Sequence, residues 1–533
     1  MCGILVQYSK EGTIDENRFK DSLYLQRQRG PDNQSYVRFG PNLIMGHTRL
    51  SIIDLNSDSN QPFKSSNGNY ISFNGEIYNF LEIREELEKQ GKNFSTTGDT
   101  EVLVSHLDES YTEKLSQLNG MWSFAYYLVN ENKLLISRDR FGKKPLYYYE
   151  DEFDLIISSE IKSIYSLKSI ERKVNKKHLL YFLNTNLWHQ EDNSTFYEDI
   201  KKVMPGQSIQ FDLSNNTKDI LKTHSLEDHI SNNKDIEELE VLLSDSVEKR
   251  LISDVPVGMF LSGGVDSSVV ASIANFKDPN LIHLTSQTTD QDNYYSKLLA
   301  EEKDLDLQEV DLNEEAIVDT LKDMTKYFEL PIPVYGISLG MNQMFKEAHF
   351  RDLKVVLDGT GGDEIFGGYH DFYGPSLLEG YIRRGNFLGL LSFIYYSFIS
   401  KYNALSAFKT LLNRFLARIF GHNDFLDDNS SYDLVNPFFL KKRKMFLPRN
   451  ISDLLSMQQF DVTRGRLQTW LQLNDLNSMM YSIETRNPLL DYRLLDYLGM
   501  KEKYKFSKGY NKFLLRQLLS RLTSVNIAWR RDK

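Results

Sequence analysis

The sequence has only one cysteine in 533 residues, and this scarcity excludes an intrachain disulfide and any metal site built from several cysteines. A reducing compartment fits that composition, so we expect a cytoplasmic protein. Positive charge is also in short supply, because the net charge is −11, whereas nonspecific nucleic-acid binding needs a basic face. We therefore expect no nucleic-acid partner.

Long hydrophobic runs are absent as well. Residues 1–6 have neither a basic segment nor a long apolar one, so we do not expect a signal peptide. The most apolar stretch, residues 386–400, holds 15 uncharged residues, fewer than the roughly 20 that a membrane helix needs. We interpret it as a buried core helix and expect no membrane association. The length and the 41% hydrophobic content support several globular domains.

A Gly-rich loop, LSGGVDSS at residues 261–268, organises the second half of the chain. The apolar residues 255–260 before it predict a buried strand, and residues 269–274 after it predict the first turns of a helix. Backbone N–H groups and the helix dipole at such a junction attract phosphate, and Asp266 adds a carboxylate where Mg²⁺ can lie between phosphate oxygens. An ordinary Ser/Gly turn that caps a helix has the same composition, so the loop alone leaves both interpretations open.

The loop resembles the pyrophosphate-binding loop of the ATP pyrophosphatase family, whose members adenylate a substrate and release pyrophosphate. Residues 280–286 look like the next strand of a parallel sheet, and residues 353–357 predict another, followed by DGTGGDE at 358–364, which resembles the family's second signature. The resemblance implies a parallel-sheet α/β domain that uses ATP and Mg²⁺, with Asp266 and Asp363 as metal ligands. The implied ATP and diphosphate positions are Leu261, Ser262, Gly263, Gly264, Asp266, Ser267, Ser268, Asp358, Gly359 and Lys512.

The one cysteine stands at position 2, before Gly3. A methionine that precedes a small residue is commonly removed, which would leave Cys2 as the N-terminal residue. A terminal cysteine carries its own base, because the free α-amino group has a pKa of about 7.7–8.0 and can take the thiol proton. A buried small residue in a first strand, residues 2–8, is the other interpretation of this position.

Five segments in order resemble the glutaminase domain of the class II glutamine amidotransferases, which are N-terminal-nucleophile hydrolases with an αββα sandwich. These segments are residues 2–4, 27–32, 46–54, 74–79 and 97–101. The resemblance implies that Cys2 attacks the side-chain amide of glutamine, while the Asn74 side chain and the Gly75 N–H form the oxyanion hole. The implied glutamine-binding residues are Arg49, Leu50, Ser51, Ile52, Ile53, Asn74, Gly75, Glu76 and Asp99.

Within that set, Arg49 would pair with the α-carboxylate of glutamine through two hydrogen bonds, and Glu76 and Asp99 would hold its α-ammonium. Without its neighbours, the Asn74-Gly75 pair also favours a type I′ hairpin turn. Residues 138–140 (RDR) stand at a predicted strand end, either as a further family segment or as a solvated charge cluster, and we assign them no catalytic role.

The remaining pattern divides the chain into two domains. Strands are predicted at residues 121–127, 133–137, 145–149 and 154–159. The polar, Asn-rich residues 214–236 predict a linker, and residues 236–252 predict an amphipathic helix after it. We therefore predict a glutaminase domain at residues 1–213 and an ATP-pyrophosphatase-type domain at residues 237–533.

Together the motifs resemble the glutamine-hydrolysing asparagine synthetase family over nearly the whole chain. The resemblance implies that ammonia from glutamine crosses an apolar tunnel to a second site, where ATP activates the β-carboxylate of aspartate and asparagine, AMP and diphosphate form. Glutamine and aspartate are thus the implied partners, and a homodimer is possible because family members are often dimers. Residues 478–491 resemble the acceptor-side helix and turn. Lys512 either stabilises the departing pyrophosphate or is a solvated helix lysine.

Two departures from the family pattern leave the acceptor open. The second signature of the best-known asparagine synthetases reads SGEGxDE, so Thr360 replaces a glutamate implicated in adenylate formation, whereas Glu364 is kept. Another carboxylate, such as a uronic acid in surface polysaccharide synthesis, is therefore an alternative acceptor. Residues 525–533 also resemble a segment that continues further in the family, so a glutaminase with an impaired synthetase half is the third hypothesis.

Overall fold

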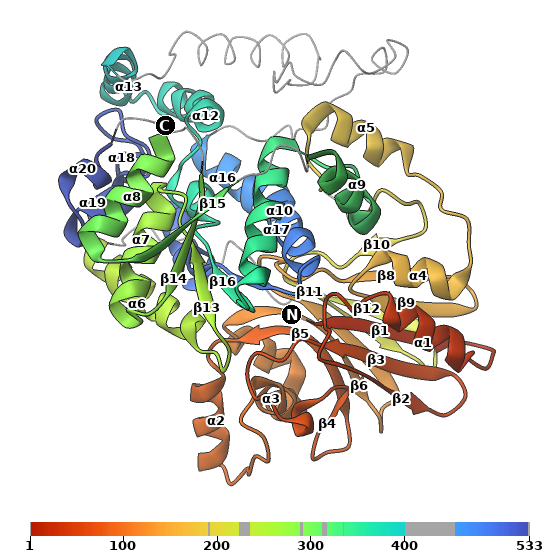
Figure 1. Cartoon of the computed structure of the whole chain (residues 1–533). Coiled ribbons are helices and arrows are strands. Elements are labelled where there is room, and N and C mark those ends of the chain that lie inside the picture. The colour runs from red at the N-terminus through yellow and green to blue at the C-terminus, as the bar shows by residue number, and fades with distance from the viewer. Residues whose placement is uncertain are drawn as a thin grey trace.

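The computed structural model describes residues 2–189, 192–222, 235–287, 291–311, 317–333, 335–399 and 453–530. The first half of the chain, red to yellow in Figure 1, holds two antiparallel sheets, and the second half, green to blue, holds one parallel sheet. The two halves lie against each other. In the described part of the chain, no helix is long and apolar enough to cross a membrane.

Two six-stranded antiparallel sheets form the core of the first half. Their strands alternate apolar side chains between the two faces, so Ile4 and Val6 of the first sheet meet Ala125 and Ile136 of the second. The first sheet has the order β10 (Lys201–Lys202), β8 (Tyr147–Glu150), β9 (Asp154–Ser158), β1 (Gly3–Ser9), β3 (Leu43–Arg49), β2 (Asn33–Phe39). The second has the order β12 (Thr217–Lys222), β11 (Gln207–Asp212), β7 (Lys133–Arg138), β6 (Gly120–Leu128), β5 (Tyr70–Ile77), β4 (Phe63–Lys64).

Helices cover the two outer faces of this sandwich. Phe19 and Ile164 pack on Leu5 of the first sheet, and Leu103 packs on Phe73 of the second. The helices on the first sheet are α1 (Glu16–Tyr24) and α4 (Ile161–Lys168), and those on the second are α2 (Phe80–Lys89) and α3 (Asp99–Lys114). Helix α5 (Lys176–Thr185) lies farther from the sheet, beside α9 (Ile317–Phe328), as Figure 1 shows. The αββα sandwich implied by the resemblance is confirmed.

The second half is built on a five-stranded parallel sheet. Its order is β15 (Asp306–Asp311), β14 (Ile282–Gln287), β13 (Val257–Phe260), β16 (Val355–Leu357), β17 (Glu484–Arg486). The chain moves from β13 to β14 on one side and returns to β16 on the other, so the strand order switches between β13 and β16. Ligands bind at such a switch point, outside the carboxyl ends of the strands. Both Gly-rich signatures follow these two strands.

Helices on both faces bury the apolar strands of the parallel sheet. Met259 and Leu357 lie in one core with Val269, and Leu284 lies in the other with Phe345. The described helices of this half are α6 (Ile236–Leu251), α7 (Val265–Lys277), α8 (Gln291–Lys303), α9 (Ile317–Phe328), α10 (Tyr335–Phe350), α11 (Gly362–Phe366), α12 (His370–Arg383), α13 (Phe387–Ile399), α16 (Leu454–Thr463), α17 (Arg466–Met479), α18 (Glu502–Lys505), α19 (Phe513–Leu522) and α20 (Val525–Ala528).

Most of the predicted elements occur at the expected places. Strands β6 to β9 and helix α6 match their predictions. The predicted linker, residues 214–236, overlaps β12, which pairs with β11, so the second sheet continues beyond residue 213. Residues 223–234 of that linker lie outside the described residues, as do residues 531–533 of the tail.

The apolar segment that begins at residue 386 forms α13, but the prediction of a buried core helix is wrong for its described side chains. Phe387 is 74% exposed, Leu388 82% and Leu391 62%. Leu390 and Phe393 pack in a cluster with α12, so one side of the helix is covered and the other faces outward. Apolar composition predicted a helix correctly, but it does not determine what the helix packs against.

Candidate active sites

Cys2 lies immediately before β1, within hydrogen-bonding reach of β5 in the other sheet. The residue is 8% exposed, and its backbone N–H donates a hydrogen bond to Oδ1 of Asn74 at 2.9 Å. Burial raises the pKa of the Cys2 thiol, although the backbone N–H of Leu50 acts in the opposite direction. A protonated thiol needs a base to become a nucleophile, and a free α-amino group on Cys2 would already be held beside Asn74.

Asn74 and Gly75 lie in β5, opposite Ser123 and Trp122 of β6, so the hairpin-turn interpretation of this pair is wrong. Gly75 has φ +157°, and a Cβ there would lie 2.0 Å from the carbonyl oxygen of Met121. Only glycine fits this close approach between two strands. Nδ2 of Asn74 lies 3.4 Å from Oγ of Ser123. The strand thus carries an amide side chain next to a residue whose backbone can approach a ligand.

Arg49 ends β3 and is nearly buried under the loop that follows. Its guanidinium donates to the carbonyl of Asn56 at 2.7 Å and to Oδ1 of Asn60 at 3.0 Å. These bonds fix the orientation of the planar group, which has five N–H donors in all. Its contact with a glutamine carboxylate stays a prediction. The neighbouring predicted positions, all buried or half-buried, are Leu50, Ser51, Ile52 and Ile53.

The two acids predicted to hold an ammonium group, Glu76 and Asp99, lie near a guanidinium from the second half of the chain. Arg486 of β17 lies 3.3 Å from Glu76 and 2.7 Å from Glu484. Burial, reinforced by Glu484, raises the pKa of Asp99 to about 6 and the pKa of Glu76 well above its usual range. An incoming ammonium group would favour the charged form of both acids.

The Gly-rich loop at residues 261–268 runs from β13 into α7, which begins at Val265 rather than at residue 269. Asp266, Ser267 and Ser268 therefore lie in the first helical turn. The N-cap residue is Gly264, which has no side chain to cap the N–H groups of that turn. This geometry favours the anion-binding interpretation over an ordinary capped turn.

The two signatures lie in direct contact. A Cβ at Gly362 would lie 2.3 Å from Cγ of Asp266, and a Cβ at Gly359 would lie 2.7 Å from the backbone nitrogen of Ser267. The glycines of the second signature therefore allow it to pack on the first turn of α7. The switch point of the sheet brings together two motifs that are about 100 residues apart in the sequence.

Lys512, just before α19, joins the acids of both signatures. Its Nζ lies 2.5 Å from Oδ2 of Asp266 and 2.6 Å from Oδ1 of Asp363. Burial raises the pKa of Asp266 to about 6. Burial opposes the charge of Lys512, but the two carboxylates outweigh it and raise the pKa of the amine. The interpretation of Lys512 as a solvated lysine is wrong, because its side chain is buried in this cluster.

The rest of the second signature is held by buried amides. Nδ2 of Asn474 donates to Oδ2 of Asp358 at 2.9 Å and lies 3.3 Å from Oγ1 of Thr360. Nδ2 of Asn487 donates to Oδ1 of Asp358 at 2.6 Å. Burial raises the pKa of Glu364 to about 8, so this acid is largely protonated at neutral pH. Sequence reasoning missed Asn474, whose segment carries no signal, and it assigned no role to Asn487, although residues 478–491 were singled out by resemblance.

The structure excludes one of the two interpretations of residues 138–140 and differs in part from the prediction for residues 478–491. Arg138 is buried and donates to the carbonyls of Lys144, Val203 and Gly142, so this segment is no solvated charge cluster. Residues 478–491 do not form a helix and turn throughout. They end α17 and then form the edge strand β17, which pairs with β16 and faces the first half.

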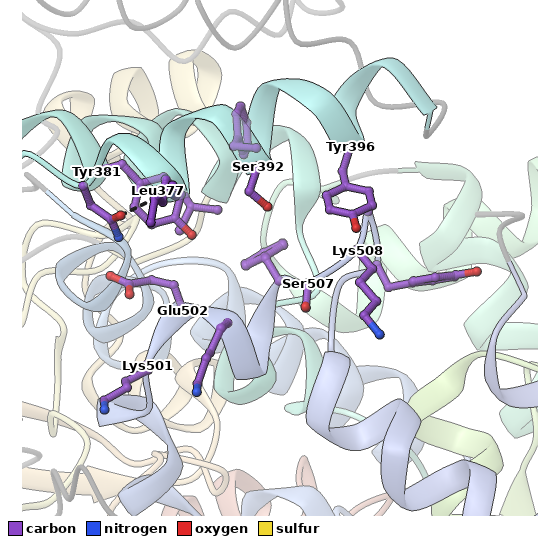
Figure 2. Close-up of a pocket in the computed structure, with 16 residues that line it drawn as sticks. Leu377, Tyr381, Ser392, Tyr396, Lys501, Glu502, Ser507 and Lys508 are labelled. Carbon is purple, nitrogen blue, oxygen red and sulfur yellow. Dashed lines mark hydrogen bonds between the residues drawn. The ribbon is translucent and has the colours of Figure 1, made fainter.

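A cavity of about 400 Å³ lies between α12, α13, α18 and the loop after α18. Figure 2 shows Tyr381 and Ser392 on one side of it and Glu502 and Ser507 on the other. None of the predicted site residues lines it. Phe506, which lines this cavity, lies close to Gly367, since a Cβ there would lie 2.9 Å from its ring.

Both halves of the chain match known protein families. A model of the glutamine amidotransferase domain matches residues 1–222, and a model of asparagine synthase matches residues 238–533. Asparagine synthetase (glutamine-hydrolyzing) 1 of Bacillus subtilis is 30% identical over 97% of this chain and 84% of its own. Putative asparagine synthetase (glutamine-hydrolyzing) 2 of Methanocaldococcus jannaschii is 31% identical over 69% of this chain and 76% of its own. Amidase chry2 of Gibberella zeae is 30% identical over 67% of this chain and 56% of its own.

Proposed function

Since this chain belongs to the asparagine synthase family of ligases, we propose that it transfers ammonia from glutamine to an adenylated carboxylate, with aspartate as the acceptor and asparagine as the product. One observation carries the proposal: the same chain holds a buried cysteine beside Asn74 and a loop-and-carboxylate cluster at the switch point of a parallel sheet. A cytoplasmic homodimer is part of this proposal, and light scattering of the purified protein tests the dimer.

At the first site, the α-amino group of Cys2 takes the thiol proton, and the sulfur attacks the side-chain carbonyl of glutamine. Nδ2 of Asn74 and the N–H of Gly75 donate to the oxygen that becomes negative. Ammonia leaves with the proton returned to it, and water then hydrolyses the thioester to give glutamate. Arg49 binds the α-carboxylate of glutamine, and Glu76 and Asp99 bind its α-ammonium.

At the second site, the loop of residues 262–264 and the first turn of α7 bind the phosphates of ATP through backbone N–H groups. The acceptor carboxylate attacks the α-phosphorus, and Lys512 accompanies the pyrophosphate as it leaves. Asp266 and Asp363 fit a Mg²⁺ ion, since both supply carboxylate oxygens and Oδ1 of Asp266 is buried without a hydrogen-bond partner among the described residues. Bound there, the ion would neutralise the phosphate oxygens.

A second acceptor is favoured by one observation. The hydroxyl of Thr360 stands where the family signature has a glutamate, and its neighbour Asn474 supplies a neutral amide rather than a charge. A carboxylate other than aspartate, such as a uronic acid, is therefore the alternative.

The acceptor is tested by measuring AMP release from ATP and Mg²⁺ with ammonium as the nitrogen donor, in parallel reactions with aspartate, glucuronate, galacturonate or no acceptor. The proposal expects AMP in the aspartate reaction, with asparagine in equal amount. AMP only with a uronic acid would replace aspartate by that acceptor. AMP with none of them, from protein that still hydrolyses glutamine, would favour an impaired synthetase half.

A further inference from the structure

Arg530 lies at the Gly-rich loop of the adenylation site. It follows α20 and is 6% exposed. Its Nη2 lies 4.0 Å from where a Cβ of Gly264 would be, and the same point lies 3.2 Å from Oγ of Ser262. Gly264 is the N-cap residue of α7. The guanidinium therefore lies beside the turn whose backbone N–H groups are proposed to bind phosphate, although the positions implied by the family resemblance do not include it.

The segment that carries Arg530 packs against two helices. Helix α20 contacts α8 and α19 (Figure 1). The backbone carbonyls of Ala528 and Arg530 accept hydrogen bonds from Nη1 of Arg516 on α19, at 2.9 and 3.1 Å. The guanidinium of Arg530 lies 4.5 Å from the centre of the Tyr295 ring on α8. Because both its backbone and its side chain are held, little entropy would be lost when Arg530 meets a ligand.

Positive charge gathers around this loop. Burial and the nearby charge of Arg530 lower the pKa of Arg516 to about 10, although Asp266 acts in the opposite direction. Each of the two guanidiniums therefore disfavours the charge of the other. Lys512, whose amine lies 2.5 Å from Asp266, adds a third cation. Like charges that are buried together are costly, and a multiply charged anion beside them reduces that cost. The triphosphate of ATP is such an anion.

Lys512 and Arg530 differ in what they contact. The amine of Lys512 contacts both Asp266 and Asp363, the two carboxylates that fit Mg²⁺. Arg530 instead approaches Gly264, and its planar group has several N–H donors that can bind two phosphate oxygens at once. The site thus combines a point charge beside the acids with a fork of donors beside the glycine turn.

We propose that Arg530 is a phosphate-binding residue of the adenylation site and that its guanidinium donates to the β- and γ-phosphates of ATP. When the acceptor carboxylate bonds to the α-phosphorus, the bond from that phosphorus to the bridging oxygen breaks, and the oxygen keeps the electron pair. Arg530 then stabilises the charge on the departing diphosphate. The proposal rests on the proposed function, because it needs ATP at this loop.

The test compares two ligands of the same site. Diphosphate has the two phosphates that Arg530 is proposed to bind, whereas AMP lacks both. Calorimetry in the presence of Mg²⁺ measures the Kd of each ligand, with Arg530→Gln as the variant. Arg521→Gln is the matched control, because Arg521 is an exposed arginine on α19 that pairs with Glu237 and Glu240. Arg530→Lys keeps the charge without the fork of donors, and thermal unfolding checks that all the variants fold alike.

In Arg530→Gln we expect the Kd of diphosphate to rise about tenfold or more, while the Kd of AMP stays at the wild-type value. Arg530→Lys should show a smaller rise in the Kd of diphosphate, because a point charge remains. Arg521→Gln should match the wild type for both ligands. In assays of AMP formation, Arg530→Gln should have a higher KM for ATP and a lower kcat than the wild type.

An unchanged Kd of diphosphate in Arg530→Gln would overturn the assignment. An equal rise in the Kd of diphosphate and of AMP would overturn it too, since it would show a structural role for Arg530 rather than a contact with the β- and γ-phosphates. If the wild type binds diphosphate but forms no AMP with any acceptor, the proposed function fails, whereas the two Kd values still decide the role of Arg530.

Discussion

The glutamine site takes a guanidinium from the other half of the chain, whereas the adenylation site supplies its own cation. Arg486, the basic group beside Glu76, belongs to the second half. Lys512, which contacts Asp266 and Asp363, belongs to the same half as both acids. The difference teaches that Glu76 has its guanidinium partner in the second half, whereas Asp266 and Asp363 have their cationic partner within their own half.

The two sites also differ in how the backbone positions them. Asn74 and Gly75 are placed by strand register, opposite Ser123 and Trp122 of the neighbouring strand β6. The adenylation residues lie in turns where two neighbouring parallel strands end. A strand buried between other layers tolerates little movement, whereas a turn at the carboxyl ends of the strands can adapt to a ligand.

The largest effect should come from Cys2→Ala, which separates the two sites completely. Removing the nucleophile should lower glutamine-driven AMP formation by about 10⁴-fold or more. Ammonium-driven AMP formation should stay at the wild-type rate, because the second site does not depend on Cys2. Parallel assays with glutamine and with ammonium measure this, and equal loss of both activities would contradict the two-site account.

The converse separation should follow from Asp266→Asn. Loss of this carboxylate should lower AMP formation about 10²–10³-fold with either nitrogen donor, because it removes the charge that contacts Lys512 and that we propose binds Mg²⁺. Glutamine hydrolysis should persist. Asp278→Asn, at the far end of α7, is the matched control and should behave as the wild type. Normal AMP formation in Asp266→Asn would remove this residue from the metal site.

A smaller effect is expected for Arg486→Gln, which removes the guanidinium that the second half places beside Glu76. Leaving Glu76 and Glu484 buried without this guanidinium should lower kcat/KM for glutamine about tenfold and cost about 3 kcal/mol of unfolding free energy. Ammonium-driven AMP formation should change less. Arg493→Gln serves as the control, since Arg493 pairs with Asp491 and Asp245 and not with Glu76. A greater loss of ammonium-driven AMP formation than of glutamine hydrolysis in Arg486→Gln would contradict this assignment of Arg486.

The smallest effect on activity is expected at Glu364, where the prediction concerns how the free energy of unfolding depends on pH. Burial raises the pKa of this acid to about 8 from its usual 4.5, so between these values the folded protein holds a proton that the unfolded chain has lost. The resulting stability is full below pH 4.5 and is lost as the pH rises through 8. Glu364→Gln stays neutral, so its unfolding free energy should gain about 3.5 kcal/mol on that of the wild type between pH 5 and 8. Denaturation curves that give the same difference in unfolding free energy between the two proteins at pH 5 and at pH 8 would contradict the raised pKa of Glu364.

The elements that the sequence predicted best are those whose strand, turn and helix patterns follow one another directly in the chain. LSGGVDSS and DGTGGDE each follow a short apolar run, so strand, turn and helix could be placed from local pattern alone. The approach of Asp266 and Asp363 to the same lysine follows from the strand order, which a family resemblance implies but periodicity does not. Cys2 and Asn74 were paired in the same way, by resemblance rather than by spacing.

What could not be predicted depends on distant packing. Asn474, Asn487 and Arg486 act through contacts with residues more than 100 positions away. Residues 478–491 were singled out by resemblance, but nothing in that segment indicates which partners Arg486 and Asn487 contact. Strand β17 has three residues, too few to show an alternation, so residues 478–491 were expected to be a helix and turn. The exposed face of α13 was not predicted, because the sequence pattern of an apolar helix is the same whether its side chains are covered or exposed.

The central claim is that one chain joins a glutamine-hydrolysing site to an adenylating site. The most direct measurement supplies glutamine labelled with ¹⁵N in its side-chain amide, together with ATP, Mg²⁺, aspartate and unlabelled ammonium. The account predicts asparagine that carries ¹⁵N in its side-chain amide, with one AMP released for each asparagine. Label that appears only as free ammonium, without AMP, would contradict it.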